Sequence, residues 1–188
     1  MNQAFVITGG PGGGKTTLLE ALAERGYRVA PEGARRIIRA RLAQGLSPRP
    51  DPAAFAREIL ASDMEQYRAV QALDGVTFFD RGVLDALYML DQARAITREE
   101  VDALVRRFPY SNIVFLLPPW EAIYGTDAER DQSFEEAVEV FQGMSRWYTQ
   151  WGYRTVEVPR VAVANRIAFI QKIIGPDSTQ AGFTGVDL

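Results

Sequence analysis

The sequence predicts an α/β fold in which five parallel strands form one sheet and helices cover both of its faces. Short apolar segments of strand character alternate along the chain with longer segments of helical period, as is typical of parallel strands joined by helices. One strand segment, IVFLL at residues 113–117, contains no polar residue. Such a segment is expected where a strand is buried between two layers of helices.

The predicted elements follow one another without an internal repeat or a domain linker. Strands are predicted at residues 5–7, 27–30, 76–79, 113–117 and 154–158. Helices are predicted at residues 15–25, 34–42, 52–73, 83–95, 98–108, 134–151 and 163–174. The helix at 34–42 is expected to turn three apolar side chains inward, those of Ile37, Ile38 and Leu42. These elements form one domain, residues 1–175, and the tail at 176–188 has no usable period and is expected to be loosely ordered.

Local signals mark the helix ends. Gly26 and Gly152 are placed to end helices in the left-handed conformation. Asp51-Pro52 is typical of an N-cap followed by proline at the first helical position. Thr97-x-x-Glu100 and Ser133-x-x-Glu136 both fit the capping box.

Composition narrows the possible chemistry. The 188 residues include no Cys and no His, which excludes disulfides, thiolate metal sites and histidine bases. Carboxylates, hydroxyls, arginines and Lys15 remain. The net charge of −3 argues against a nucleic-acid partner. The longest apolar run, near residues 113–120, is well short of the roughly 18 residues of a membrane span. We therefore expect a cytoplasmic protein without such a span.

Residues 9–16 fit the phosphate-binding pattern G-x-x-x-x-G-K-[ST] between a predicted strand and a predicted helix. Glycines let the backbone wrap around an anion, and the N-terminus of the helix attracts phosphate. Lys15 would reach the β- and γ-phosphates, and the Thr16 hydroxyl would hold Mg²⁺. A flexible glycine turn is the alternative, but it needs neither five glycines nor the Lys-Thr that follows them. The predicted nucleotide-binding residues are Gly9, Gly10, Pro11, Gly12, Gly13, Gly14, Lys15, Thr16 and Thr17.

Polar residues also follow the second and third strands, at the sheet edge where ligands bind in such folds. Asp80 is predicted to order Mg²⁺ or to accept a proton, with a role as N-cap of the next helix as the alternative. Arg81 would contact phosphate oxygens, or else form a surface ion pair. Glu32 is predicted to face the acceptor together with Arg35 and Arg36. For Arg36 a solvated position at the helix start is an equal alternative.

Three further features bear on the type of reaction. Arg130 lies in an irregular charged segment after the fourth strand, where a lid could close an arginine over the transferred phosphoryl group. A solvated loop is the alternative. Asp80 is followed by Arg and not by the Glu of ATP-driven remodelling enzymes, and the guanine-reading motif Asn-Lys-x-Asp is missing. Residues 158–163 and Arg166 could pack on adenine or could form an ordinary loop before the last helix.

Four motifs occur in order along the chain: Thr8-Gly9-Gly10-Pro11 to Lys15-Thr16-Thr17, Pro31-Glu32-x-Ala34-Arg35-Arg36, Asp80-Arg81-Gly82-x-x-Asp85 with Tyr88, and Asp127-x-x-Arg130. With this combination, residues 3–174 resemble the AAA-like predicted ATPases grouped with P-loop small-molecule kinases, and more distantly the ribosylnicotinamide kinase domain.

The resemblance implies a P-loop NTPase three-layer sandwich with a helical lid. It also implies Mg-nucleotide at residues 9–17, ATP more than GTP, phosphate contacts for Arg81 and Arg130, and Asp85 as a further acceptor-site candidate. Some animal relatives of this group are described as nucleotide- and lipid-binding proteins.

Three functions are compatible with these features. The first is a kinase that transfers the γ-phosphoryl group of ATP to a nucleoside-like or other small acceptor, with Lys15, Asp80, Arg81 and Arg130 as catalytic residues. The second is a binding module in which Mg-nucleotide controls a surface for a protein or lipid partner. The third and weakest is an ATPase that acts on nucleic acid.

Overall fold

The computed structural model describes residues 2–47, 50–124 and 133–175. Its strands form one sheet in the order β2-β3-β1-β4-β5, and every neighbouring pair is parallel. The five strands are β1 (Asn2–Gly9), β2 (Arg28–Ala30), β3 (Gly75–Asp80), β4 (Ile113–Leu117) and β5 (Arg154–Glu157). The predicted five-stranded parallel sheet is confirmed.

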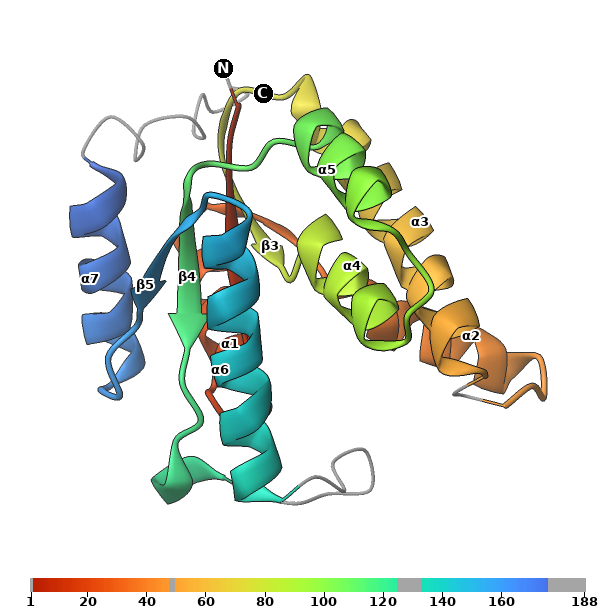
Figure 1. The fold of residues 1–188 in the computed structure, drawn as a ribbon. Coiled ribbons are helices and arrows are strands. Elements are labelled where there is room, and N and C mark those ends of the chain that lie inside the picture. Colours follow the sequence, from red (N-terminus) through yellow and green to blue (C-terminus); the bar gives the residue numbers. More distant parts are fainter. Residues whose placement is uncertain (1, 48–49, 125–132, 176–188) are drawn as a thin grey trace.

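Helices cover both faces of this sheet (Figure 1). They are α1 (Lys15–Ala23), α2 (Gly33–Ala43), α3 (Pro52–Gln71), α4 (Val83–Gln92), α5 (Arg98–Arg107), α6 (Phe134–Gln150) and α7 (Val163–Ile174). A short 3₁₀ turn, η1 (Glu121–Ile123), follows β4. None of the helices in the described ranges is long and apolar enough to cross a membrane.

The alternation of side chains along β1 divides the core into two layers. Phe5 and Ile7 pack with apolar residues of α1 and α7, whereas Ala4 and Val6 pack with those of α3, α4, α5 and α6. Successive strand residues point to opposite faces, so helices cover β1 on both faces of the sheet. Val6 and Ile7 are fully buried, and each contributes roughly 1.5–3 kcal/mol to folding by that burial.

The helix ends are where the sequence placed them, within a few residues. The Asp51 side chain accepts a hydrogen bond from the backbone N–H of Ala54 at 3.1 Å, and both capping boxes are formed in both directions. Gly26 and Gly152 have φ angles of 84° and 85°, the left-handed conformation expected of them. Local capping chemistry thus fixes the lengths of these helices.

One detail of the prediction is wrong, and one of its alternatives is excluded. Leu42 does not face the core, because its side chain is 57 % exposed and α2 contacts the rest of the fold mainly through α3. Asp80 is not the N-cap of α4, because that position is taken by Gly82. The tail at 176–188 and the segment with Arg130 lie outside the described residues.

The strand order explains how the polar strand ends come together. β3 lies between β1 and β2, with Asp80 beside Ile7 of β1 and Phe79 beside Ala30 of β2. The loop after β1 and the residues that follow Ala30 therefore flank Asp80 and Arg81 at the carboxyl edge of the sheet.

Candidate functional site

The glycine loop between β1 and α1 is held by close contacts that leave no room for side chains. Gly9 has a φ of 138°, and a Cβ atom there would lie 2.3 Å from the carbonyl oxygen of Leu117. Gly12 has a φ of 77°, and a Cβ atom there would lie 2.1 Å from the ring of Tyr124. Only glycine satisfies both the left-handed backbone and the contact at these positions.

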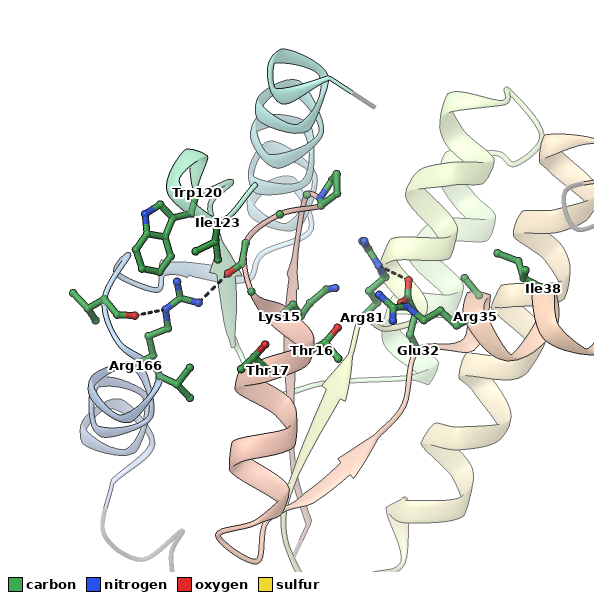
Figure 2. Close-up of a pocket in the computed structure, with 18 of the residues that line it drawn as sticks. Lys15, Thr16, Thr17, Glu32, Arg35, Ile38, Arg81, Trp120, Ile123 and Arg166 are labelled. Carbon is green, nitrogen blue, oxygen red and sulfur yellow. Dashed lines mark hydrogen bonds and ion pairs between the residues drawn. The ribbon is translucent and has the colours of Figure 1, made fainter. Parts of the chain in front are cut away.

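A cavity of about 910 Å³ opens over this loop (Figure 2). Its lining falls into a central part around the loop and the first turn of α1, a side formed by α2 with Glu32 and Arg81, and an opposite side near α7. The size is in the range of small-molecule sites, roughly 300–1,000 Å³. The lining residues are Gly10, Pro11, Gly12, Gly13, Gly14, Lys15, Thr16, Thr17, Glu32, Ala34, Arg35, Ile38, Arg39, Leu42, Arg81, Trp120, Ile123, Val161, Ala162, Val163 and Arg166.

Lys15 lines the cavity and forms an ion pair with Asp80, which lies behind Lys15 and is not itself a lining residue. Lys15 Nζ lies 3.3 Å from Asp80 Oδ1. That oxygen is buried, and it accepts no hydrogen bond from any residue in the described part of the chain. A buried carboxylate oxygen with one charged neighbour can take a further cation or donor.

The residues present could bind Mg²⁺ only if phosphate oxygens of a nucleotide supplied the remaining ligands. The Thr16 side chain lies near that of Lys15 in the pocket (Figure 2), and Asp80 offers a carboxylate oxygen that accepts no hydrogen bond. Within the described ranges, no group of three acidic side chains could hold a metal by itself. Mg²⁺ commonly binds through one or two protein ligands and the oxygens of a nucleotide. Thr16 and Asp80 fit that role.

Arg81 connects the two acidic groups on the α2 side of the cavity. Its Nε atom lies 3.1 Å from Glu32 Oε1, and its Nη1 atom lies 3.4 Å from Asp85 Oδ1. The second oxygen of Glu32 lies 3.0 Å from Arg35 Nε. The backbone of Arg81 has a φ of 66°, a conformation that costs a residue with a side chain roughly 1–2 kcal/mol. The ion pairs hold Arg81 in this strained position.

The charges in this cluster set the protonation of Glu32. Burial by itself raises the pKa of Glu32, but the positive charges of Arg81, Lys15 and Arg35 outweigh it and hold the pKa below the usual range. Burial opposes the charge on Arg81 as well, yet the nearby carboxylates raise its pKa above the ordinary value. Glu32 is therefore an ionised acceptor of hydrogen bonds at neutral pH.

Asp85 lies behind Arg81 and not on the cavity lining. It is 4 % exposed, and it accepts hydrogen bonds from the Thr8 hydroxyl, from the Gly82 N–H at 2.9 Å and from the Tyr148 hydroxyl at 2.7 Å. These donors and Arg81 use both of its oxygens. In the described structure Asp85 positions Arg81 and has no open path to an acceptor.

Arg36 also lies away from the cavity lining. Its Nη2 atom donates a hydrogen bond to the Ser62 hydroxyl of α3 at 2.6 Å, and the residue is exposed. Of the two arginines predicted to face the acceptor, only Arg35 lines the cavity. The open alternative for Arg36, a position at the helix surface, matches this placement more closely.

Arg166 ties the opposite side of the cavity to the glycine loop. Its Nη1 atom donates to the Gly13 carbonyl at 2.9 Å, and its Nε atom donates to the Val161 carbonyl at 2.9 Å. The guanidinium also lies 4.9 Å from the centre of the Trp120 ring (Figure 2). The residue is 3 % exposed, and burial lowers its pKa below the ordinary value. Residues 161–163 also line this side, whereas residues 158–160 do not.

Sequence reasoning missed part of the lining. It placed Trp120 and Ile123 in an irregular segment, and it assigned the apolar residues of α2 to the core. The four-residue spacing of Ala34, Ile38 and Leu42 was a readable signal of one helix face, but spacing does not say whether that face meets the core or a ligand.

Comparisons with known proteins agree with this architecture. A family model described as an AAA domain matches residues 4–166. A search of curated proteins found no match. The fold is shared with nucleoside and nucleotide kinases of known structure, which are too distant in sequence to show more than the fold.

Two of these structures are of deoxyadenosine kinase from M. mycoides. One has the products dCMP and a flexible dCDP bound and is 16 % identical, with a TM-score of 0.64 and coverage of 92 % of this chain and 98 % of that chain. The other has dATP bound and is 15 % identical, with a TM-score of 0.62 and the same coverage. A third is thymidylate kinase from Ehrlichia chaffeensis, 15 % identical, with a TM-score of 0.63 and coverage of 93 % and 99 %.

Proposed function

The chain belongs to the AAA domain family and has a P-loop kinase fold, and from this premise we propose that it is an ATP-dependent small-molecule kinase. One observation carries the proposal. A single cavity joins the glycine loop with Lys15 and Thr16 to the Glu32–Arg81 pair on the α2 side. A donor phosphate and an acceptor hydroxyl could therefore meet at the centre of the site.

The donor half holds the triphosphate. Backbone N–H groups of the loop and the N-terminus of α1 surround the phosphates, and Lys15 moves its ammonium from Asp80 to the β- and γ-phosphates. Thr16 and Asp80 would hold Mg²⁺, which neutralises charge on the phosphate oxygens. The proposal puts the nucleoside part of ATP against Trp120, Arg166 and residues 161–163, which line the side of the cavity opposite Glu32.

The acceptor half orients a hydroxyl. Ionised Glu32 accepts a hydrogen bond from it and takes its proton as the hydroxyl oxygen bonds to the γ-phosphorus. The bond from that phosphorus to the β–γ bridging oxygen breaks, and ADP leaves with the bonding electrons. Arg81 holds Glu32 in place and offers positive charge to the transferred group. A role for Arg130 stays a prediction from sequence alone.

The test is a screen of metabolites for ATP-dependent phosphorylation, followed by kinetics of two variants with the acceptor found. We expect Asp80→Asn to lower kcat at least about 100-fold, because it removes a metal-binding carboxylate. Asp91→Asn, which removes an exposed carboxylate at the end of α4, should keep full activity.

Equal activity of Asp80→Asn and the wild type would refute the kinase proposal. Tight Mg-ATP binding with no acceptor phosphorylated from a broad screen would favour the nucleotide-dependent binding module instead.

A further inference from the structure

The side of α2 that faces the cavity has a composition that the proposed transfer chemistry does not use. Ala34, Ile38 and Leu42 follow one another at intervals of four residues, with Arg35 and Arg39 beside them, and all five line the cavity. Each residue of an α-helix turns by about 100°, so these five side chains fall within a sector of about 140°. The apolar side chains occupy one part of the sector and the arginines occupy the other.

The apolar part of this face is open to the cavity. Leu42 is 57 % exposed, and Gly33 is the one buried residue of α2. Single exposed apolar residues are ordinary on protein surfaces. Three in a row along the wall of a cavity are typical of a site that receives an apolar group.

Basic residues outnumber acidic residues in the lining of the cavity. Five basic residues line the cavity, namely Lys15, Arg35, Arg39, Arg81 and Arg166, against the one acidic residue Glu32. Lys15 is paired with Asp80, Arg81 with Glu32 and Asp85, and Arg166 with backbone carbonyls. Arg35 pairs with Glu32 through Nε.

Arg39 differs from all of these. It has no ion pair or hydrogen bond with another residue in the described ranges, although the chain as a whole is acidic. An arginine on a cavity wall with its guanidinium unpaired is suited to bind a phosphate or a carboxylate through two parallel hydrogen bonds.

We propose that the acceptor carries an anionic group, a phosphate or a carboxylate, next to an apolar ring or chain. The anionic group binds Arg39 with help from Arg35, and the apolar part lies against Ala34, Ile38 and Leu42. This placement leaves the hydroxyl to be phosphorylated near Glu32, which precedes Arg39 by seven residues, or about two helical turns, on the same wall. The proposal rests on the kinase function only in taking this side as the acceptor side.

The test uses a matched pair of fluorescent probes with the full chain, with and without Mg-ATP. One probe is 8-anilinonaphthalene-1-sulfonate, which joins apolar rings to an anion, and the other is N-phenyl-1-naphthylamine, which lacks the sulfonate. We expect the anionic probe to bind one per chain. Arg39→Gln should weaken that binding about tenfold and leave the neutral probe unchanged. Leu42→Gln should weaken both probes.

Control variants separate this site from a general effect of charge or hydrophobicity. Arg106→Gln removes a surface arginine of α5, and Leu73→Gln removes an exposed leucine, both away from the cavity lining. Neither should change the binding of either probe. Competition with phenyl phosphate, benzoate and benzyl alcohol then identifies the anion, since one or both of the first two should displace the probe and the alcohol should not.

The proposal fails if the wild type binds both probes equally, if Arg39→Gln leaves the anionic probe unchanged, or if neither anion displaces it. These readouts need no phosphoryl transfer. The acceptor site can thus be supported where the kinase reaction is absent, and it can be refuted where that reaction is present.

Discussion

Asp63 of α3 is a buried carboxyl group that the proposed chemistry does not use. It is 6 % exposed, and its Oδ2 atom has no hydrogen-bond partner in the described part of the chain. Burial raises its pKa to about 8, with Asp85 and Glu32 adding to the shift and Arg81 and Arg36 opposing it. At neutral pH the folded protein therefore keeps Asp63 protonated.

This pKa makes the stability of the fold depend on pH. An unfolded aspartate has a pKa of about 3.9, so from about pH 4 to pH 8 the folded state holds a proton that the unfolded chain has lost. The free energy of unfolding should fall by about 1.4 kcal/mol per pH unit through that window on account of Asp63. Asp63→Asn removes the titrating group and should flatten the profile, which urea denaturation at pH 5, 7 and 9 measures.

Asp91→Asn, at an exposed aspartate of α4, is the control and should keep the wild-type slope. The same pH profile for wild type and Asp63→Asn would show that Asp63 is ionised in the folded state.

Individual site residues were predictable to the extent that their chemistry is local. The roles proposed for Lys15 and Asp80 follow from a motif and from the end of a strand. In the structure the two side chains form an ion pair. Asp85 was an acceptor-site candidate because the resemblance to P-loop small-molecule kinases implied it. Its burial depends on Thr8 and Tyr148, which are 77 and 63 residues away in the chain, and no local pattern contains that information.

At the level of elements, α7 is joined to the glycine loop by one side chain. Replacing Arg166 by Lys keeps the charge but loses the fork that reaches both Gly13 and Val161. We expect Arg166→Lys to lower the free energy of unfolding by about 1.5–3 kcal/mol and to weaken ATP binding about tenfold. Chemical denaturation and equilibrium ATP titration measure the two effects.

Arg160→Lys is the matched control, since Arg160 also donates to a backbone carbonyl, that of Pro119, but does not line the cavity. Its ATP affinity should equal that of the wild type. Unchanged ATP affinity in Arg166→Lys would mean that α7 does not help to shape the loop.

The helices and strands themselves could be predicted because capping and periodicity are encoded locally. The orientation of α2 could not be predicted from the sequence. The period of Ile37, Ile38 and Leu42 correctly indicated a helix, but α2 extends from the sheet beside α3 (Figure 1), and part of its apolar face meets a cavity. A core and a ligand site require the same apolar spacing, so only the tertiary arrangement separates them.

For the whole molecule, bound nucleotide should stabilise the fold through Lys15. A ligand at 100 times its Kd adds about 2.7 kcal/mol to the free energy of unfolding, which corresponds to roughly 5–11 °C in Tm for a chain of this size. Lys15→Met should lose this gain with Mg-ATP. Lys172→Met, at the other lysine of the sequence, should keep it, and thermal unfolding with and without Mg-ATP measures both.

An equal gain in Tm for Lys15→Met and the wild type would show that the Lys15 side chain does not contribute to nucleotide binding. Without nucleotide, Lys15→Met should also unfold at a lower temperature than Lys172→Met, because Asp80 loses its charged partner.

The ion pair between Lys15 and Asp80 has a thermodynamic consequence for how the two halves of Mg-ATP bind. A nucleotide without its cation would draw Lys15 away and leave a buried carboxylate uncompensated, and a cation without nucleotide would compete with the ammonium of Lys15. Each partner alone therefore meets an opposing charge that the other relieves. The affinities for nucleotide and cation should be positively cooperative, and linkage requires each to raise the other by the same factor.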